Sequence, residues 1–355
     1  MLAFRVGLLI SSVILMISGL WAGLLRLGWQ LPTNVSAMQH GPLMVVAFFS
    51  TLIALERAVG LGKSWVYLAP LLLGLAGFLS LFFGTTALGL SIYILGSAIY
   101  LASAIYLFVL QKADFSFVMA LGALSLFLAN ILWAFALPLT AVVIFWASYL
   151  VLIITGERLE LSRFVRKPKL AVQVFLASVV VNILGLVVSL FSQGLGVRLV
   201  ALAFLVMAAW LLRYDIARIN LKRSGVYRFM ALALLAAYFW LAVAGLWFLV
   251  VGMAQAGPNY DAPLHAIFVG FVFSMVFAHA PVIFPAVLKL KIEFSKILYA
   301  PLVLLHLSLA LRLIGDVYSY KLRYWGGMLS AIAIVLYFLS AMSVTLLASF
   351  KAAKN

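Results

Sequence analysis

The chain has 355 residues, of which 67% are hydrophobic and only 9% are charged. Soluble domains are about 45–50% apolar and about 25% charged, so this composition excludes an ordinary water-soluble protein. The 24 basic residues outnumber the 8 acidic ones, which gives a net charge of +16, and cysteine is absent. The lack of cysteine excludes disulfides, cysteine-ligated iron–sulfur clusters, covalently attached c-type haem and thiolate copper sites.

Twelve apolar runs, each about long enough to cross a bilayer, follow one another along the chain. We expect them to be helices, because in lipid every backbone amide must bond within its own segment. The first is too long and too bulky at its end for a cleaved signal peptide. The expected bounds are 4–27, 36–58, 65–83, 87–110, 114–136, 138–156, 169–192, 196–213, 226–252, 262–288, 296–315 and 324–348.

The connections between these runs are short, and the longest are 157–168 and 214–225. Neither can bury a core of its own, so the sequence predicts a single twelve-span transmembrane domain over residues 1–355. The fold class is therefore an all-α integral membrane protein.

Loop charges predict the orientation. Basic residues at the two termini and in the loops after even-numbered spans account for all of the 24 except Arg26, Arg198, Arg312, Lys321 and Arg323. Because basic residues concentrate on the cytoplasmic side, we expect both termini to be cytoplasmic and the protein to lie in the cytoplasmic (inner) membrane of a cell. The same dispersed charges argue against nucleic acid as a partner.

The chain has four histidines, His40, His265, His279 and His306, and all fall within expected spans. Ionisable groups in a membrane usually face the bundle interior, so each histidine is a candidate functional residue. The alternative for each is a structural hydrogen bond to a neighbouring helix.

Depth sorts these histidines into two pairs. His40 and His265 lie four residues from the outer ends of spans 2 and 10, about 6 Å deep, whereas His279 and His306 lie ten residues from cytoplasmic lysines, about 15 Å deep. Two imidazoles facing each other are what a bis-histidine b-type haem requires. We therefore expect haem b on His40 and His265, and we keep His279 and His306 as ligands of a second haem or as structural groups. A zinc site is disfavoured, because among carboxylates only Asp261 lies near histidine depth.

Two segments resemble known haem proteins. The segment 261–285, with His265, Gly270-Phe-Val-Phe, His279 and Phe284-Pro285, resembles span 10 of the haem–copper oxidase catalytic subunit and the corresponding part of the NnrS family. The latter are twelve-span haem- and copper-containing membrane proteins of the nitric oxide response. Gln39-His40-Gly-Pro-Leu-Met44 is similar to the outer start of span 2 in those families, which carries a low-spin haem ligand there. The resemblance implies a bundle like the oxidase subunit, with His40 and His265 as haem ligands.

The sequence departs from the oxidases where their copper is bound. Oxidases need a span-6 histidine with a tyrosine four residues later and a histidine pair on span 7, and runs 138–156 and 169–192 contain no histidine. We therefore expect that the protein is not a terminal oxidase. His279 and His306 have no counterpart in the resemblance and depend on the depth argument alone.

The predicted function is that of a membrane b-type haem protein, which transfers electrons with a redox partner protein or senses nitric oxide or oxygen. The alternative is a transporter or channel whose buried histidines handle protons or substrate, with Pro281 and Pro285 breaking span 10 and Asn130 and Asn182 as polar groups within the membrane. A purely structural membrane subunit is a third reading.

Two Glu-Arg pairs stand at the cytoplasmic edge, four spans apart. They are Glu56-Arg57 at the end of span 2 and Glu157-Arg158 at the end of span 6. We interpret both as snorkelling interfacial ion pairs that hold helix ends, in preference to a proton-uptake role.

Overall fold

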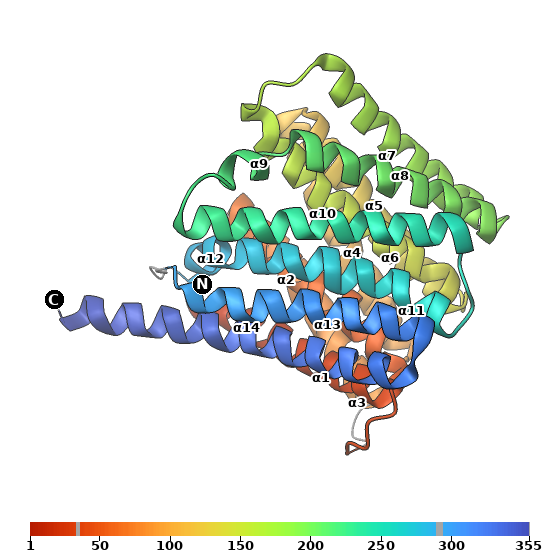
Figure 1. Ribbon diagram of the computed structural model, residues 1–355, viewed down its shortest axis with the longest axis horizontal. Helices are drawn as coiled ribbons and strands as arrows, with labels where there is room; N and C mark the ends of the chain where they lie inside the picture. Colours follow the sequence, from red (N-terminus) through yellow and green to blue (C-terminus); the bar gives the residue numbers. More distant parts are fainter. Residues whose placement is uncertain (33–35, 289–293, 355) are drawn as a thin grey trace. The chain divides into compact units, whose positions relative to one another are not determined.

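The computed structural model describes residues 1–32, 36–288 and 294–354, and every regular element among them is helical (Figure 1). Lys289 and Lys291, two of the expected cytoplasmic charges, lie outside the described residues. Twelve helical segments of the described chain are long and apolar enough to cross a membrane. The prediction of an all-α protein with twelve spans is thus confirmed, while the side on which the termini lie stays a prediction.

The chain divides into two compact units, Met1–Tyr149 and Leu150–Asn355. The helices that begin in the first unit are α1 (Leu2–Arg26), the short η1 (Ala37–Gln39), the π-helix η2 (Pro42–Phe49), α2 (Ser50–Leu61), η3 (Ser64–Tyr67), α3 (Leu68–Phe83), α4 (Ala87–Gln111), α5 (Asp114–Ala134) and α6 (Leu139–Leu161). The helices of the second unit are η4 (Ser162–Phe164), α7 (Lys169–Ser189), α8 (Gln193–Tyr214), α9 (Ala217–Asn220), α10 (Gly225–Val251), α11 (Pro258–His265), the π-helix η5 (Ala266–Phe273), α12 (Ser274–Leu288), η6 (Lys296–Leu298), α13 (Tyr299–Tyr318) and α14 (Tyr320–Lys354).

In the first unit, α1 and α3 both pack on η2, and α4 lies between α3 and α5. Small residues permit the close approach. A Cβ at Gly77 of α3 would lie 2.7 Å from the Cβ of Ala47 in η2, closer than side-chain atoms pack. Asn130 is bonded within this unit, where its Oδ1 accepts from Trp146 Nε1 at 3.3 Å. This polar group therefore serves the packing of α5 against α6.

In the second unit, α7 pairs with α8 and α13 pairs with α14, each as an antiparallel hairpin (Figure 1). Glycine makes both hairpins tight, since a Cβ at Gly196 would collide with the backbone of Ser189, and one at Gly315 would collide with the backbone of Arg323. The helix α10 packs on α8, η5 and α12. These contacts hold span 10, formed by α11, η5 and α12, against α10.

The expected break of span 10 at its prolines is wrong. Pro281 and Pro285 both lie inside α12, which runs without interruption from Ser274 to Leu288. Proline is tolerated within membrane helices where neighbouring groups satisfy the backbone carbonyls that it frees. The irregular part of span 10 is instead η5, which has no proline. The broken-helix argument for a transporter therefore loses its basis at these two residues.

Candidate functional site

Two π-helices mark corresponding places in spans 2 and 10. The π-helix η2 begins two residues after His40, and η5 begins directly after His265; each is eight residues long and is followed by a serine, Ser50 or Ser274. The π-helix is rare, mostly occurs as a single wide turn, and is frequent at functional sites. The two candidate histidines thus share a local backbone design that sets them apart from His279 and His306.

His40 is held in the first unit by α1. Its Nδ1 lies 2.8 Å from the carbonyl oxygen of Gly19, and since a carbonyl can only accept, Nδ1 carries the proton. The ring lies over Gly23, where a Cβ would be 2.7 Å from both Cε1 and Nδ1 of His40. The neutral imidazole is therefore fixed in one tautomer, with its lone pair on Nε2.

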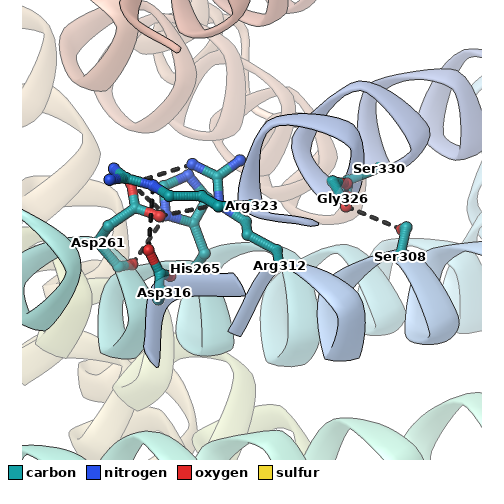
Figure 2. Close-up of polar contacts among 8 residues, drawn as sticks. All are labelled: Asp261, His265, Ser308, Arg312, Asp316, Arg323, Gly326 and Ser330. Carbon is teal, nitrogen blue, oxygen red and sulfur yellow. Dashed lines mark hydrogen bonds and ion pairs between the residues drawn. The ribbon is translucent and has the colours of Figure 1, made fainter. Parts of the chain in front are cut away.

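His265 has the same tautomer in the second unit. Its Nδ1 donates to the carbonyl oxygen of Asp261 at 2.9 Å and lies 3.4 Å from the Oδ1 of that residue (Figure 2). The lone pair of the neutral ring is again on Nε2. A metal-ligating histidine typically donates its other ring N–H to a carbonyl or carboxylate, which orients the ring and raises its basicity.

A partly buried charge cluster holds Asp261. Arg312 of α13 binds its carboxylate with two hydrogen bonds, from Nε at 2.9 Å and from Nη2 at 3.0 Å. Arg323 of α14 lies 3.4 Å from Asp261 and 3.0 Å from Asp316 (Figure 2). The two guanidinium groups balance the two carboxylates, so the cluster is formally neutral and holds the end of span 10 against the α13–α14 hairpin. The cluster was not predicted from the sequence, because Arg312 and Arg323 were counted only as loop charges.

His279 lies in a second buried network. Its Nδ1 donates to the Met275 carbonyl at 2.8 Å, and its Nε2 lies 3.3 Å from Nη1 of Arg158. Arg158 also binds Asp215 through Nε at 2.9 Å and Nη2 at 2.8 Å. Since arginine can only donate, the Nε2 lone pair of His279 is directed to Arg158. This contact competes with metal binding at His279.

The interpretation of Arg158 as a snorkelling interfacial residue is wrong. Its side chain is only 2% exposed, and its carboxylate partner is Asp215, in the connection between α8 and α9. Asp215 also accepts from Ser162 Oγ at 3.1 Å and from the Ala217 backbone N–H at 2.7 Å. The ion pair therefore fastens the end of α6 to the start of α9 inside the second unit.

Lys167 lies next to this ion pair. Its Nζ donates to the Ser162 carbonyl at 2.5 Å and lies 5.6 Å from the centre of the Trp210 ring. Burial lowers the pKa of Lys167 below its ordinary value, and the nearby Asp215 carboxylate opposes that shift. The loop before α7 thus adds a second cation, beside Arg158, at the same end of the unit.

His306 makes a different contact. Trp240 Nε1 donates to its Nδ1 at 3.0 Å, which places the proton of the neutral ring on Nε2. Gly270 of η5 permits this arrangement, because a Cβ there would lie 2.5 Å from the Cβ of Trp240 and 2.8 Å from Leu309. Gly270 therefore serves helix packing. In this tautomer His306 offers no lone pair at Nε2.

The described residues contain no group of three or more His, Asp or Glu side chains that could hold a metal ion. A six-coordinate haem asks less of the protein, namely one imidazole lone pair on each face of the ring. His40 and His265 have the donor chemistry for this role. Both residues were candidates from the sequence, and His40 lies in the first unit whereas His265 lies in the second.

The Gly23 contact leads to a testable prediction. Gly23→Ala is expected to push the His40 ring off the Gly19 carbonyl and to cost about 1–3 kcal/mol of stability, as overpacking does. Thermal unfolding in detergent measures the cost. Gly7→Ala in the same helix is the matched control, since nothing lies within 4 Å of a Cβ there. It should leave stability unchanged or higher by up to about 1 kcal/mol. Equal melting temperatures for the two variants would contradict the prediction.

One family model, described as a domain of unknown function (DUF8744), matches residues 5–346 of the chain. No curated protein matches the chain. The match reaches into all twelve spans and includes both histidines that precede π-helices.

Proposed function

The chain belongs to the family of the domain of unknown function DUF8744, and we propose that it is a b-type haem protein of the cytoplasmic membrane with His40 and His265 as axial ligands. A bis-histidine haem supplies one-electron redox chemistry. The function we propose is electron transfer with a redox partner protein, or sensing of nitric oxide or oxygen.

One observation carries the proposal, the common design of His40 and His265. Each precedes an eight-residue π-helix, and each donates its Nδ1 proton to a backbone carbonyl, 2.8 Å away for Gly19 and 2.9 Å away for Asp261. In both neutral rings the lone pair is therefore on Nε2, the atom through which such a histidine would bind iron. The resemblance of the segments around these two residues to haem-binding spans supports the same assignment.

The chain's own residues have distinct parts in this proposal. His40 and His265 bind the cofactor, while the Gly19 carbonyl and Asp261 keep the proton at Nδ1 and fix the plane of each ring. Arg312 acts on His265 through Asp261 in this proposal, because it fixes the Asp261 carboxylate. Asp261 and Arg312 are therefore positioning residues.

The proposal assigns one haem to the chain. His279 and His306 take structural parts, since Arg158 donates to the Nε2 of His279 and Trp240 donates to the Nδ1 of His306. A second haem on this pair would require both hydrogen bonds to be exchanged for bonds to iron.

The reduced-minus-oxidised absorption spectrum of the purified protein tests the proposal. We expect the Soret and α bands of a six-coordinate b-type haem and about one haem per chain. About two haems per chain would instead indicate that His279 and His306 bind a second haem. A colourless protein, after expression with sufficient haem, would overturn the proposal and favour a transporter or a structural subunit.

A further inference from the structure

A pocket of about 580 Å³ opens beside the start of α10, within the unit Leu150–Asn355. Ser224, Arg228 and Lys296 line its polar part, and Leu232, Phe294 and Tyr299 line its apolar part. None of the described residues that line it is acidic. The pocket is therefore positively charged on one side and apolar on the other.

The positive charge of the pocket has no exposed carboxylate nearby in the preceding linker. Residues 213–228 contain five basic residues and a single acidic one, Asp215. The side chain of Asp215 is fully buried, and it binds Arg158 in the interior. The one negative charge of this linker is therefore paired inside the protein, and the other charged residues of the linker are basic.

The residues of α10 that line the pocket lie at different depths in the membrane. Arg228 lies in the first turn of α10, and Leu232 lies one turn further, about 6 Å deeper along the helix and on the same face. Leu232 is 38% exposed, as expected of a side chain that meets lipid. The first turn of a helix also favours anions, because its backbone N–H groups and dipole are positive there. A ligand here meets cations at the membrane surface and apolar side chains below.

We propose that this pocket binds the phosphate headgroup of an anionic phospholipid, with the acyl chains along Leu232 and Phe294. The cationic lining fits the phosphate, and the apolar lining fits the chains, which free phosphate lacks. Arg228 and Lys296 are on the side that the charge pattern assigns to the cytoplasm, where anionic lipids attract basic residues. This inference does not depend on the haem assignment.

The test compares the thermal unfolding of the purified full chain in phosphatidylcholine nanodiscs with that in nanodiscs containing phosphatidylglycerol. A ligand that binds only the folded state raises the unfolding temperature. We expect stabilisation by phosphatidylglycerol, and we expect the double variant Arg228→Gln/Lys296→Gln to bind the lipid roughly tenfold more weakly or worse. The charge-conserving variant Arg228→Lys/Lys296→Arg should keep most of the effect.

Lys222→Gln/Arg223→Gln is the matched control, because it removes two charges from the same linker without touching the pocket lining. It should respond to phosphatidylglycerol as the unaltered chain does. The proposal is overturned if the control loses the response as fully as the pocket variant, which would indicate diffuse attraction, or if no lipid response occurs. Equal stabilisation by inorganic phosphate alone would also overturn it in favour of a free-anion site.

Discussion

Replacing His40 or His265 by alanine is expected to abolish the low-spin haem spectrum of the purified protein. Each substitution removes one of the two imidazole lone pairs that a six-coordinate haem needs. Since changes to the groups behind a metal ligand already cost about 10–100-fold in affinity, loss of the ligand itself should lower the haem content of the preparation at least as far. The measurement is the haem-to-protein ratio together with the position of the α band.

His306→Ala is the control for these two variants. It removes an imidazole from another membrane span, α13, and the hydrogen bond lost with it is that from Trp240. Its haem content should equal that of the unaltered chain. Haem content that survives in both His40→Ala and His265→Ala, or that falls only in the control, would refute the ligand assignment.

A substitution at Asp261 tests whether the charge cluster positions His265. Asp261→Asn keeps the backbone carbonyl that binds His265 Nδ1 but removes the charge that Arg312 and Arg323 hold. A role confined to helix packing would change the melting temperature alone. A positioning role for His265 would also shift the reduction potential of the haem, because the basicity of an axial imidazole depends on the group that accepts its proton.

The sequence predicted the spans well, because lipid imposes long apolar helices that hydropathy reveals directly. It could not predict η2 and η5. A π-helix bonds its backbone within the segment as an α-helix does, so the apolar runs 36–58 and 262–288 read the same for either form. The histidines at the start of these segments were found because ionisable residues are rare in such runs.

The buried charges were misread for a different reason. Loop charges near a membrane are normally solvated, and Arg158 and Asp215 are 57 residues apart, so their pairing depends on how α6 and α8 end side by side within the second unit. Arg312 and Asp316 offered a better signal that was not used, since they lie four residues apart on one helix next to a basic turn. Arg312 lies three residues inside the end of the expected span 296–315, and an arginine within a membrane span usually pairs with another group in the interior.

Arg158→Met is expected to destabilise the protein strongly. The substitution leaves the buried carboxylate of Asp215 without its guanidinium partner, and breaking a buried ion pair in this way costs about 3–5 kcal/mol. At this chain length the apparent melting temperature in detergent should fall by about 4–7 °C. Arg166→Met removes an exposed charge from the following loop and should change stability by less than about 0.5 kcal/mol.

The double variant Arg158→Met/Asp215→Asn shows whether the ion pair itself is the cause. Asparagine keeps an oxygen for the Ala217 N–H and for Ser162, and it removes the uncompensated charge. The double variant should therefore be more stable than Arg158→Met alone, with a coupling of about 0.5–3 kcal/mol. If Arg158→Met melts at the temperature of Arg166→Met, the pair does not hold α6 to α9. If the double variant is instead less stable than Arg158→Met, the hydrogen bonds that Asp215 accepts from Ser162 and from the Ala217 N–H matter more than its charge.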